Sequence, residues 1–268
     1  MGSILTPGPS SVAGYNLAIE NMTPGRRRGN GWGEEKVEVE AGVGWEALAE
    51  AVKAGDVRRV REMVDQDPGL KTARAPSGES ALLLAVYYGQ EEVARWLADS
   101  GVPTDLHEAA ALGLTDRVAA HLAARPQAVN AFSFDGWTAL HLAAFFGRTA
   151  TAELLLESGA AADLLARNRQ ANLPLHAATA ARRVDVVSLL LGHGSDVNAR
   201  TADGWTPLHL AAHGGFAELV DIFVEKGAGL NTRNAQGATP LDLAIEQGRT
   251  EVAAHLRALQ GGSKERDR

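Results

Sequence analysis

The sequence GWTALHLAA at residues 136–144 returns almost unchanged as GWTPLHLAA at residues 204–212. A third copy, NLPLHAA, lies between them at residues 172–178, and GATPLDLA follows at residues 237–244. The four copies share one marker position, which is occupied by His141, His176, His209 and Asp242. Successive markers are 35, 33 and 33 residues apart, and a fixed period of this length indicates a repeat architecture.

Weaker copies precede these four. We place their markers at Ala49, Leu83 and His107, which brings the number of units to about seven. The step from Leu83 to His107 is only 24 residues, about ten short of the period. We therefore expect that one of the connections between units, which we call fingers, is missing at this point.

Each unit has the pattern of two short helices. Thr206 is typical of a helix N-cap, and Pro207 in the first turn costs no hydrogen bond. Apolar residues then recur with helical periodicity in a second segment, as at 219–223, before Gly227 ends it. Two helices of this length cannot bury their own apolar face, so neighbouring units must stack into an all-α solenoid.

These motifs resemble the ankyrin repeat family, whose period and T-P-L-H-x-A pattern they share. The resemblance covers roughly residues 45–259. It implies stacked helix-turn-helix repeats joined by short β-hairpin-like fingers. It also implies that the imidazoles of His141, His176 and His209 hydrogen-bond the backbone between units. Arg182 stands where the family usually has a helix-ending glycine, so the local geometry is expected to depart there.

Two segments are expected to lie outside the solenoid of residues 45–260: an N-terminal tail of residues 1–44 and a polar C-terminal tail of residues 261–268. The N-terminal tail is rich in Gly, Pro and Ser and holds one apolar island with Tyr15, Leu17 and Ile19. A disordered leader has this composition. A short docking peptide that orders on a partner is the alternative.

Composition argues against several classes of protein. The net charge is −7 and the pI is near 5.6, which does not favour binding to nucleic acid or to an anionic membrane surface. The chain has no cysteine, so disulfides, thiolate metal sites and cysteine nucleophiles are excluded. No apolar run approaches the ~20 residues of a membrane span, and the first thirty residues lack the apolar core of a secretory signal. We expect a cytoplasmic protein.

The sequence does not suggest an enzyme. It contains no G-x-S-x-G elbow, phosphate-binding loop or dinucleotide fingerprint. His209 and His213 are spaced for one helix face, but the glutamate of a zinc-protease motif is absent. We therefore expect no catalytic residue, metal, cofactor or small-molecule substrate.

The resemblance implies a concave groove lined by the finger tips and the exposed face of each first helix. The positions that match are Tyr87, Tyr88, Phe134, Trp137, Phe145, Phe146, Trp205 and His213. Seven of the fourteen aromatic residues fall there, and aromatic residues are frequent hot spots of interfaces. The alternative is that Tyr87, Tyr88, Phe145 and Phe146 pack against one another across the shortened third unit.

Two functions follow as predictions. The first is a non-catalytic module that binds a partner protein through this groove. The second is an assembly or cargo component that is recruited to a larger complex through residues 1–44.

Overall fold

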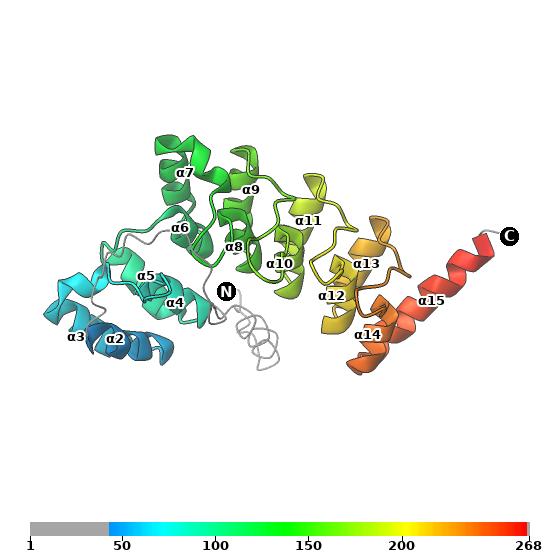
Figure 1. Ribbon diagram of the computed structural model, residues 1–268, viewed down its shortest axis with the longest axis horizontal. Helices are drawn as coiled ribbons and strands as arrows, with labels where there is room; N and C mark the ends of the chain where they lie inside the picture. The colour runs from blue at the N-terminus through cyan, green and yellow to red at the C-terminus, as the bar shows by residue number, and fades with distance from the viewer. Residues whose placement is uncertain (1–42, 267–268) are drawn as a thin grey trace, which may run out of the picture.

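The computed structural model describes residues 43–266, and within them fourteen α-helices follow one another as seven consecutive pairs (Figure 1). The first helices of the pairs are α2 (Val43–Lys53), α4 (Ala81–Tyr87), α6 (Leu106–Leu112), α8 (Ala139–Phe145), α10 (Pro174–Ala180), α12 (Pro207–Gly214) and α14 (Pro240–Glu246). The second helices are α3 (Val57–Gln66), α5 (Glu91–Asp99), α7 (Thr115–Ala124), α9 (Thr149–Glu157), α11 (Val184–Gly192), α13 (Ala217–Glu225) and α15 (Thr250–Arg266). The predicted all-α repeat fold is confirmed.

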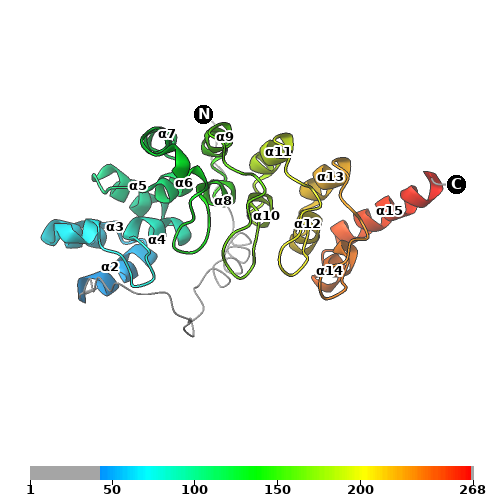
Figure 2. The ribbon, with the colours of Figure 1, turned by 45° about the horizontal axis from the view of Figure 1, so that its top comes forward.

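The pairs stand side by side in an elongated row, with the first helices in one layer and the second helices in another (Figures 1 and 2). α8 packs between α6 and α10, and α12 packs between α10 and α14. Leucines at one position of successive first helices, Leu140, Leu175 and Leu208, are fully buried. Alanines fill the space between neighbouring first helices, as at Ala143 and Ala211, so the backbones approach closely. The core therefore runs along the whole row.

The first helices begin at side chains that cap them. Ser80, Asp105, Thr138, Thr206 and Thr239 each accept a hydrogen bond from the backbone N–H three residues later. In α10, α12 and α14 a proline follows the cap, where its missing N–H has no helical partner to lose. The Thr-Pro signal in the sequence thus sets where α12 and α14 begin, whereas α10 begins after Leu173 with its proline alone.

Left-handed residues separate the two helices of a pair. Gly147 follows α8 with φ of 69°, a conformation that costs glycine little. Arg182 holds the same place after α10 with φ of 54°, which for a residue with a β-carbon costs about 1–2 kcal/mol. The turn itself is retained, so our expectation that the local geometry departs at Arg182 is wrong.

The third pair explains the irregular spacing of the markers. Only residues 100–105 connect α5 to α6, whereas residues 193–206 connect α11 to α12, so the shortened connection is confirmed. The N-cap of α6 is Asp105, and the residue three positions after it is Glu108. Our marker at His107 is therefore wrong by one residue. Glu108 to His141 is 33 residues, which restores the period.

The last helix extends farther than expected. α15 ends at Arg266, so the boundary that we placed at residue 260 falls within a helix. Two of the connections carry a single antiparallel bridge, Arg74 with Ser80 and Phe132 with Thr138. Within residues 43–266, none of the helices is long and apolar enough to cross a membrane.

Candidate interaction surface

The marker histidines join neighbouring units, as the resemblance implies. Each donates from Nε2 to a carbonyl of the next connection: His141 to Asn172 O at 2.9 Å, His176 to Trp205 O at 3.1 Å and His209 to Ala238 O at 3.1 Å. A fourth bond of this kind joins His107 to Ala131 O at 2.9 Å. The histidines thus hold the connections in register along the row.

The hydrogen bonds at Nδ1 of the marker histidines determine which ring nitrogen carries the proton. Nδ1 of His141 accepts the backbone N–H of Thr138 at 3.3 Å, and Nδ1 of His209 accepts that of Thr206 at 3.1 Å. Nδ1 therefore carries no proton, and the proton on Nε2 is the one donated to the carbonyl. Burial lowers the pKa of His141 and of His176 from 6.5 to about 4, so both imidazoles are neutral near pH 7.

The eight predicted contact residues divide by exposure. Tyr88 and Phe134 expose 43% and 37% of their surface, and Trp205 and His213 are half-buried. Tyr87, Trp137, Phe145 and Phe146 are buried. For Tyr87, Phe145 and Phe146 the alternative of local packing describes the geometry; Trp137, which that alternative did not include, is buried as well. Tyr15, Leu17 and Ile19 lie outside the described residues.

The four buried aromatic residues form one cluster between the second and fourth pairs. The ring centroids of Tyr87 and Phe146 are 5.9 Å apart. Phe146 meets Phe145 edge-on at 5.1 Å, and Phe145 meets Trp137 edge-on at 5.6 Å. Edge-to-face pairs at these distances are favourable for aromatic rings. The cluster, to which Tyr88 does not belong, fills the space beside the shortened third unit.

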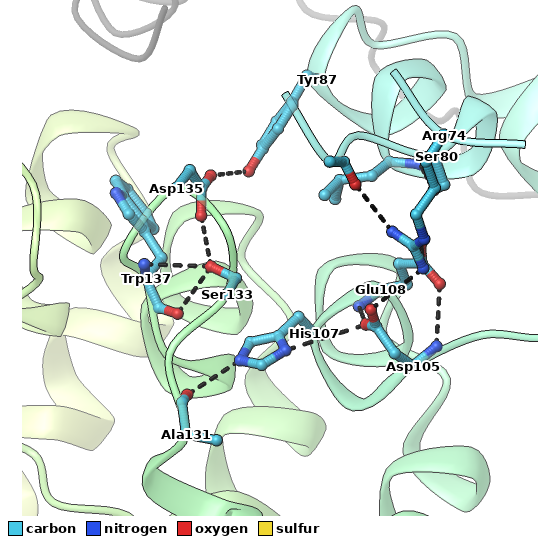
Figure 3. Close-up of polar contacts among 12 residues, drawn as sticks. Arg74, Ser80, Tyr87, Asp105, His107, Glu108, Ala131, Ser133, Asp135 and Trp137 are labelled. Carbon is cyan, nitrogen blue, oxygen red and sulfur yellow. Dashed lines mark hydrogen bonds and ion pairs between the residues drawn. The ribbon is translucent and has the colours of Figure 1, made fainter. Parts of the chain in front are cut away.

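A polar chain continues from this cluster (Figure 3). The hydroxyl of Tyr87 donates to Asp135, the hydroxyl of Ser133 donates to the same carboxylate, and Ser133 Oγ accepts the backbone N–H of Trp137 at 3.1 Å. Burial and the neighbouring carboxylate of Asp135 raise the pKa of Tyr87 well above its usual value. The phenol therefore stays protonated and acts as a donor that ties α4 to the finger before α8.

Fingers that are neighbours in space but not in sequence meet at this point. Elsewhere successive fingers are joined by backbone hydrogen bonds, such as Arg167 N to Gly136 O at 2.8 Å and Ala235 N to Asp203 O at 2.9 Å. At the shortened third unit a side chain replaces them. Phe134 packs on Gly78, where an added β-carbon would lie 3.1 Å from Phe134 Cβ. Phe134 can therefore reach Gly78 because no finger lies between the two connections.

Sequence reasoning missed the ion pair that supports this arrangement. Glu108 is 1% exposed, and its Oε1 lies 3.1 Å from Arg74 Nη2 (Figure 3). Its other oxygen accepts the backbone N–H of Asp105 at 2.9 Å, the capping role that histidine has in other units. A carboxylate cannot donate to the next carbonyl, and His107 makes that bond instead. In the sequence, the signal for this ion pair was Glu108 at the position that histidine occupies in other units.

The half-buried pair lies two units farther along. The ring of Trp205 meets that of His213 edge-on at 5.4 Å and that of His209 at 6.2 Å. Burial and the charge of Arg249 lower the pKa of His213. The exposed and half-buried residues of the predicted surface thus have different neighbours: Lys53 lies near the Tyr88 ring, Phe134 packs on Gly78, and Trp205 packs on His213.

The described residues contain no cluster of side chains that is typical of a metal centre. Within residues 43–266, no group of three or more His, Asp or Glu side chains is placed to hold a metal ion. Asp242 replaces the marker histidine, and its carboxylate accepts the backbone N–H of Thr239 at 2.9 Å. That hydrogen bond lowers the pKa of Asp242. Asp242 thus acts as a local cap in α14.

The fold and these contacts define a helical repeat protein with histidine-linked units. A family model described as ankyrin repeats in three copies matches residues 106–201 and 195–265, which is more than half of the chain. The chain belongs to the ankyrin repeat family. Comparison with curated proteins gave no significant match. Ankyrin repeats are generally protein–protein interaction modules and are typically non-catalytic.

Proposed function

We propose that this protein is a non-catalytic module that binds a partner protein through the surface of its fingers and first helices. The contact is made by Tyr88, Phe134, Trp205 and His213. The observation that carries the proposal is the exposure of Tyr88 and Phe134 next to a cluster that buries four other aromatic side chains.

The exposed pair has the properties of an interface anchor. A monomeric fold gains stability by burying large aromatic side chains, so exposed ones beside a buried cluster favour a binding role. Tyr88 is also near a cation, since Lys53 Nζ lies 5.7 Å from the centre of its ring. Truncation of an aromatic residue that a partner buries costs roughly 2 kcal/mol or more in binding.

The buried residues support the exposed ones. Tyr87 precedes Tyr88 directly, and its bond to Asp135 connects α4 to the finger that carries Phe134. Trp137 belongs to the same finger, and it packs on Phe145, which in turn packs on Phe146. In this proposal they position Tyr88 and Phe134 without contacting the partner.

Site-specific photocrosslinking tests the proposal. A photoreactive residue replaces Phe134 or Tyr88 in the full chain, and Ala119, which is exposed on the second helix α7, serves as the control position. We expect the same protein to be crosslinked from positions 88 and 134 and not from position 119. Crosslinking of that protein with equal yield from all three positions would contradict the assignment.

Recruitment through residues 1–44 stays a separate prediction, since residues 1–42 lie outside the part of the chain that the structure describes. Its test is a graft of residues 1–44 onto an unrelated soluble protein. Transfer of the partner to the graft would favour the tail. Loss of the partner on replacement of Tyr88 and Phe134 by alanine, in a chain whose helical content is unchanged, would favour the solenoid.

A further inference from the structure

A side chain bridges the turns of neighbouring helix pairs at most junctions of the row. It belongs to the residue that directly follows the left-handed turn, and it donates to a carbonyl of the preceding pair. Within residues 43–266 four such bonds are present: Gln90 Nε2 to Lys53 O at 2.8 Å, Arg148 Nε to Ala111 O at 3.0 Å, Arg183 Nε to Phe145 O at 3.1 Å and Arg249 Nε to His213 O at 3.1 Å. We call each of these side chains a clip.

A clip also covers the turn glycine of the preceding pair. A β-carbon built on Gly113 would lie 2.9 Å from Cδ of Arg148, and one on Gly147 would lie 2.8 Å from Cδ of Arg183. The accepting carbonyl always belongs to the residue two positions before the turn residue. Each clip thus lies over the turn residue of the preceding pair and donates to the carbonyl two residues before that turn residue; we call this place a slot.

One further junction is closed by different chemistry. Phe216 follows the turn after α12, at the position of a clip, and its ring has no donor for a carbonyl. The turn residue that it faces is Arg182, whose guanidinium lies 5.7 Å from the centre of the Phe216 ring. The slot is therefore covered by a cation–π contact.

The junction between the second and third pairs has no clip. Leu114 holds the clip position and has no side-chain donor, and a β-carbon on Gly89 would meet nothing within 4 Å. A pocket of about 260 Å³ opens there, with an apolar part formed by Val86, Leu112, Leu114 and Phe146. By its position in the chain, two residues before Gly89, Tyr87 O corresponds to the acceptor of the other slots, and no side chain within residues 43–266 is seen to donate to it.

We propose that this pocket binds an arginine side chain of a partner protein, which takes the place of the missing clip. Its guanidinium would donate to Tyr87 O over Gly89, and its methylene stem would pack on Leu114 and Phe146. Three of the four clips within the chain are arginines, so the slot is built for this side chain. The site involves the helix–helix turns and does not depend on the surface proposed above.

Charged groups of both signs line the pocket. Arg95, Arg148 and Arg183 contribute three guanidiniums, and Glu91 and Asp99 on α5 contribute two carboxylates. The Nε atoms of Arg148 and Arg183 are directed at carbonyl oxygens as clips. The carboxylates of Glu91 and Asp99 are the groups on the α5 wall with which the head of a partner's arginine would pair.

A titration of the full chain with blocked arginine (N-acetyl-arginine amide) tests the proposal, followed by the amide NMR signals of residues 86–91 and 112–114. We expect saturable shifts in these segments and weaker binding of the neutral analogue, blocked citrulline. Leu114→Arg supplies the absent clip and should weaken arginine binding about tenfold or more, since a charge-assisted bond is removed. Leu114→Met keeps an apolar side chain of similar size and should bind as the natural chain does.

Leu114→Gln is the second sealing variant, because Gln90 shows that glutamine also serves as a clip. It replaces Leu114→Arg if the arginine variant does not fold. The proposal is overturned if the natural chain shows no saturable shifts, if citrulline or blocked glutamate binds as well as arginine, or if a folded sealing variant retains full affinity.

Discussion

Acidification is expected to destabilise the solenoid through His141 and His176. Both imidazoles are neutral in the folded protein, and burial lowers the pKa of each from 6.5 to about 4. The unfolded chain takes up a proton on each histidine near pH 6.5, whereas the folded chain does so only near pH 4. The stability that neutral burial provides is therefore fully present above pH 6.5 and is lost as the pH falls from 6.5 to 4.

The size of this effect follows from the shifts. Each pKa differs from its unfolded value by about 2.5 units, and one unit corresponds to about 1.4 kcal/mol. Each histidine then costs about 3 kcal/mol of unfolding free energy at pH 4, and the two together cost about 6 kcal/mol. A domain of ordinary stability has about 5–15 kcal/mol in total, so the fold should be close to unfolding there.

Urea unfolding followed by circular dichroism, at pH values from about 7 to about 4.5, measures this slope. His176→Gln removes one titrating group and should reduce the slope by about 1.4 kcal/mol per pH unit. His193→Gln, at an exposed position outside the buried histidine contacts, is the matched control. A stability that does not change over this range, or an equal effect of the two variants, would refute the reasoning.

Two further predictions concern stability and are measured by urea unfolding at neutral pH. Arg74→Met leaves the buried Glu108 without its cation and should lower the free energy of unfolding by about 2 kcal/mol. The loss is smaller than for a fully buried pair because Arg74 is partly exposed. Addition of Glu108→Gln should recover part of the loss, and an unchanged urea midpoint for Arg74→Met alone would contradict this prediction. Gly136→Ala places a β-carbon 2.6 Å from Arg167 O and should cost about 1–3 kcal/mol more than Gly237→Ala, which has the same left-handed backbone and open space. Equal losses for the two glycine variants would show that this approach of the fingers is not tight.

Local patterns were sufficient to predict the repeats. The Thr-Pro caps and the marker histidines depend on residues within one unit or in the next, so their spacing in the sequence carries the information. The histidine bonds to the next connection were predicted from the resemblance and are confirmed at His141, His176 and His209. The marker at His107 was wrong because only the observed N-cap, Asp105, shows which residue lies three positions into α6.

The sequence did not predict which of the aromatic residues are exposed. Tyr87 and Tyr88 are adjacent, yet one is buried against Phe146 and the other is exposed, because a helix directs consecutive side chains about 100° apart. Which of the two faces the fourth unit depends on how the third unit is placed after its short connection. The buried pair of Arg74 and Glu108 is also a product of that placement.

The sequence by itself determined the family, the helix boundaries at the capped ends and the place of the missing finger, since these follow from period, caps and chain length. Only the tertiary structure decided how the gap is closed, which aromatic side chains remain exposed, and that the junction at Leu114 lacks a clip. The physical reason is that stacking energy is shared between units. A missing connection or an absent donor changes contacts between segments that are distant in sequence, and these contacts leave no local pattern.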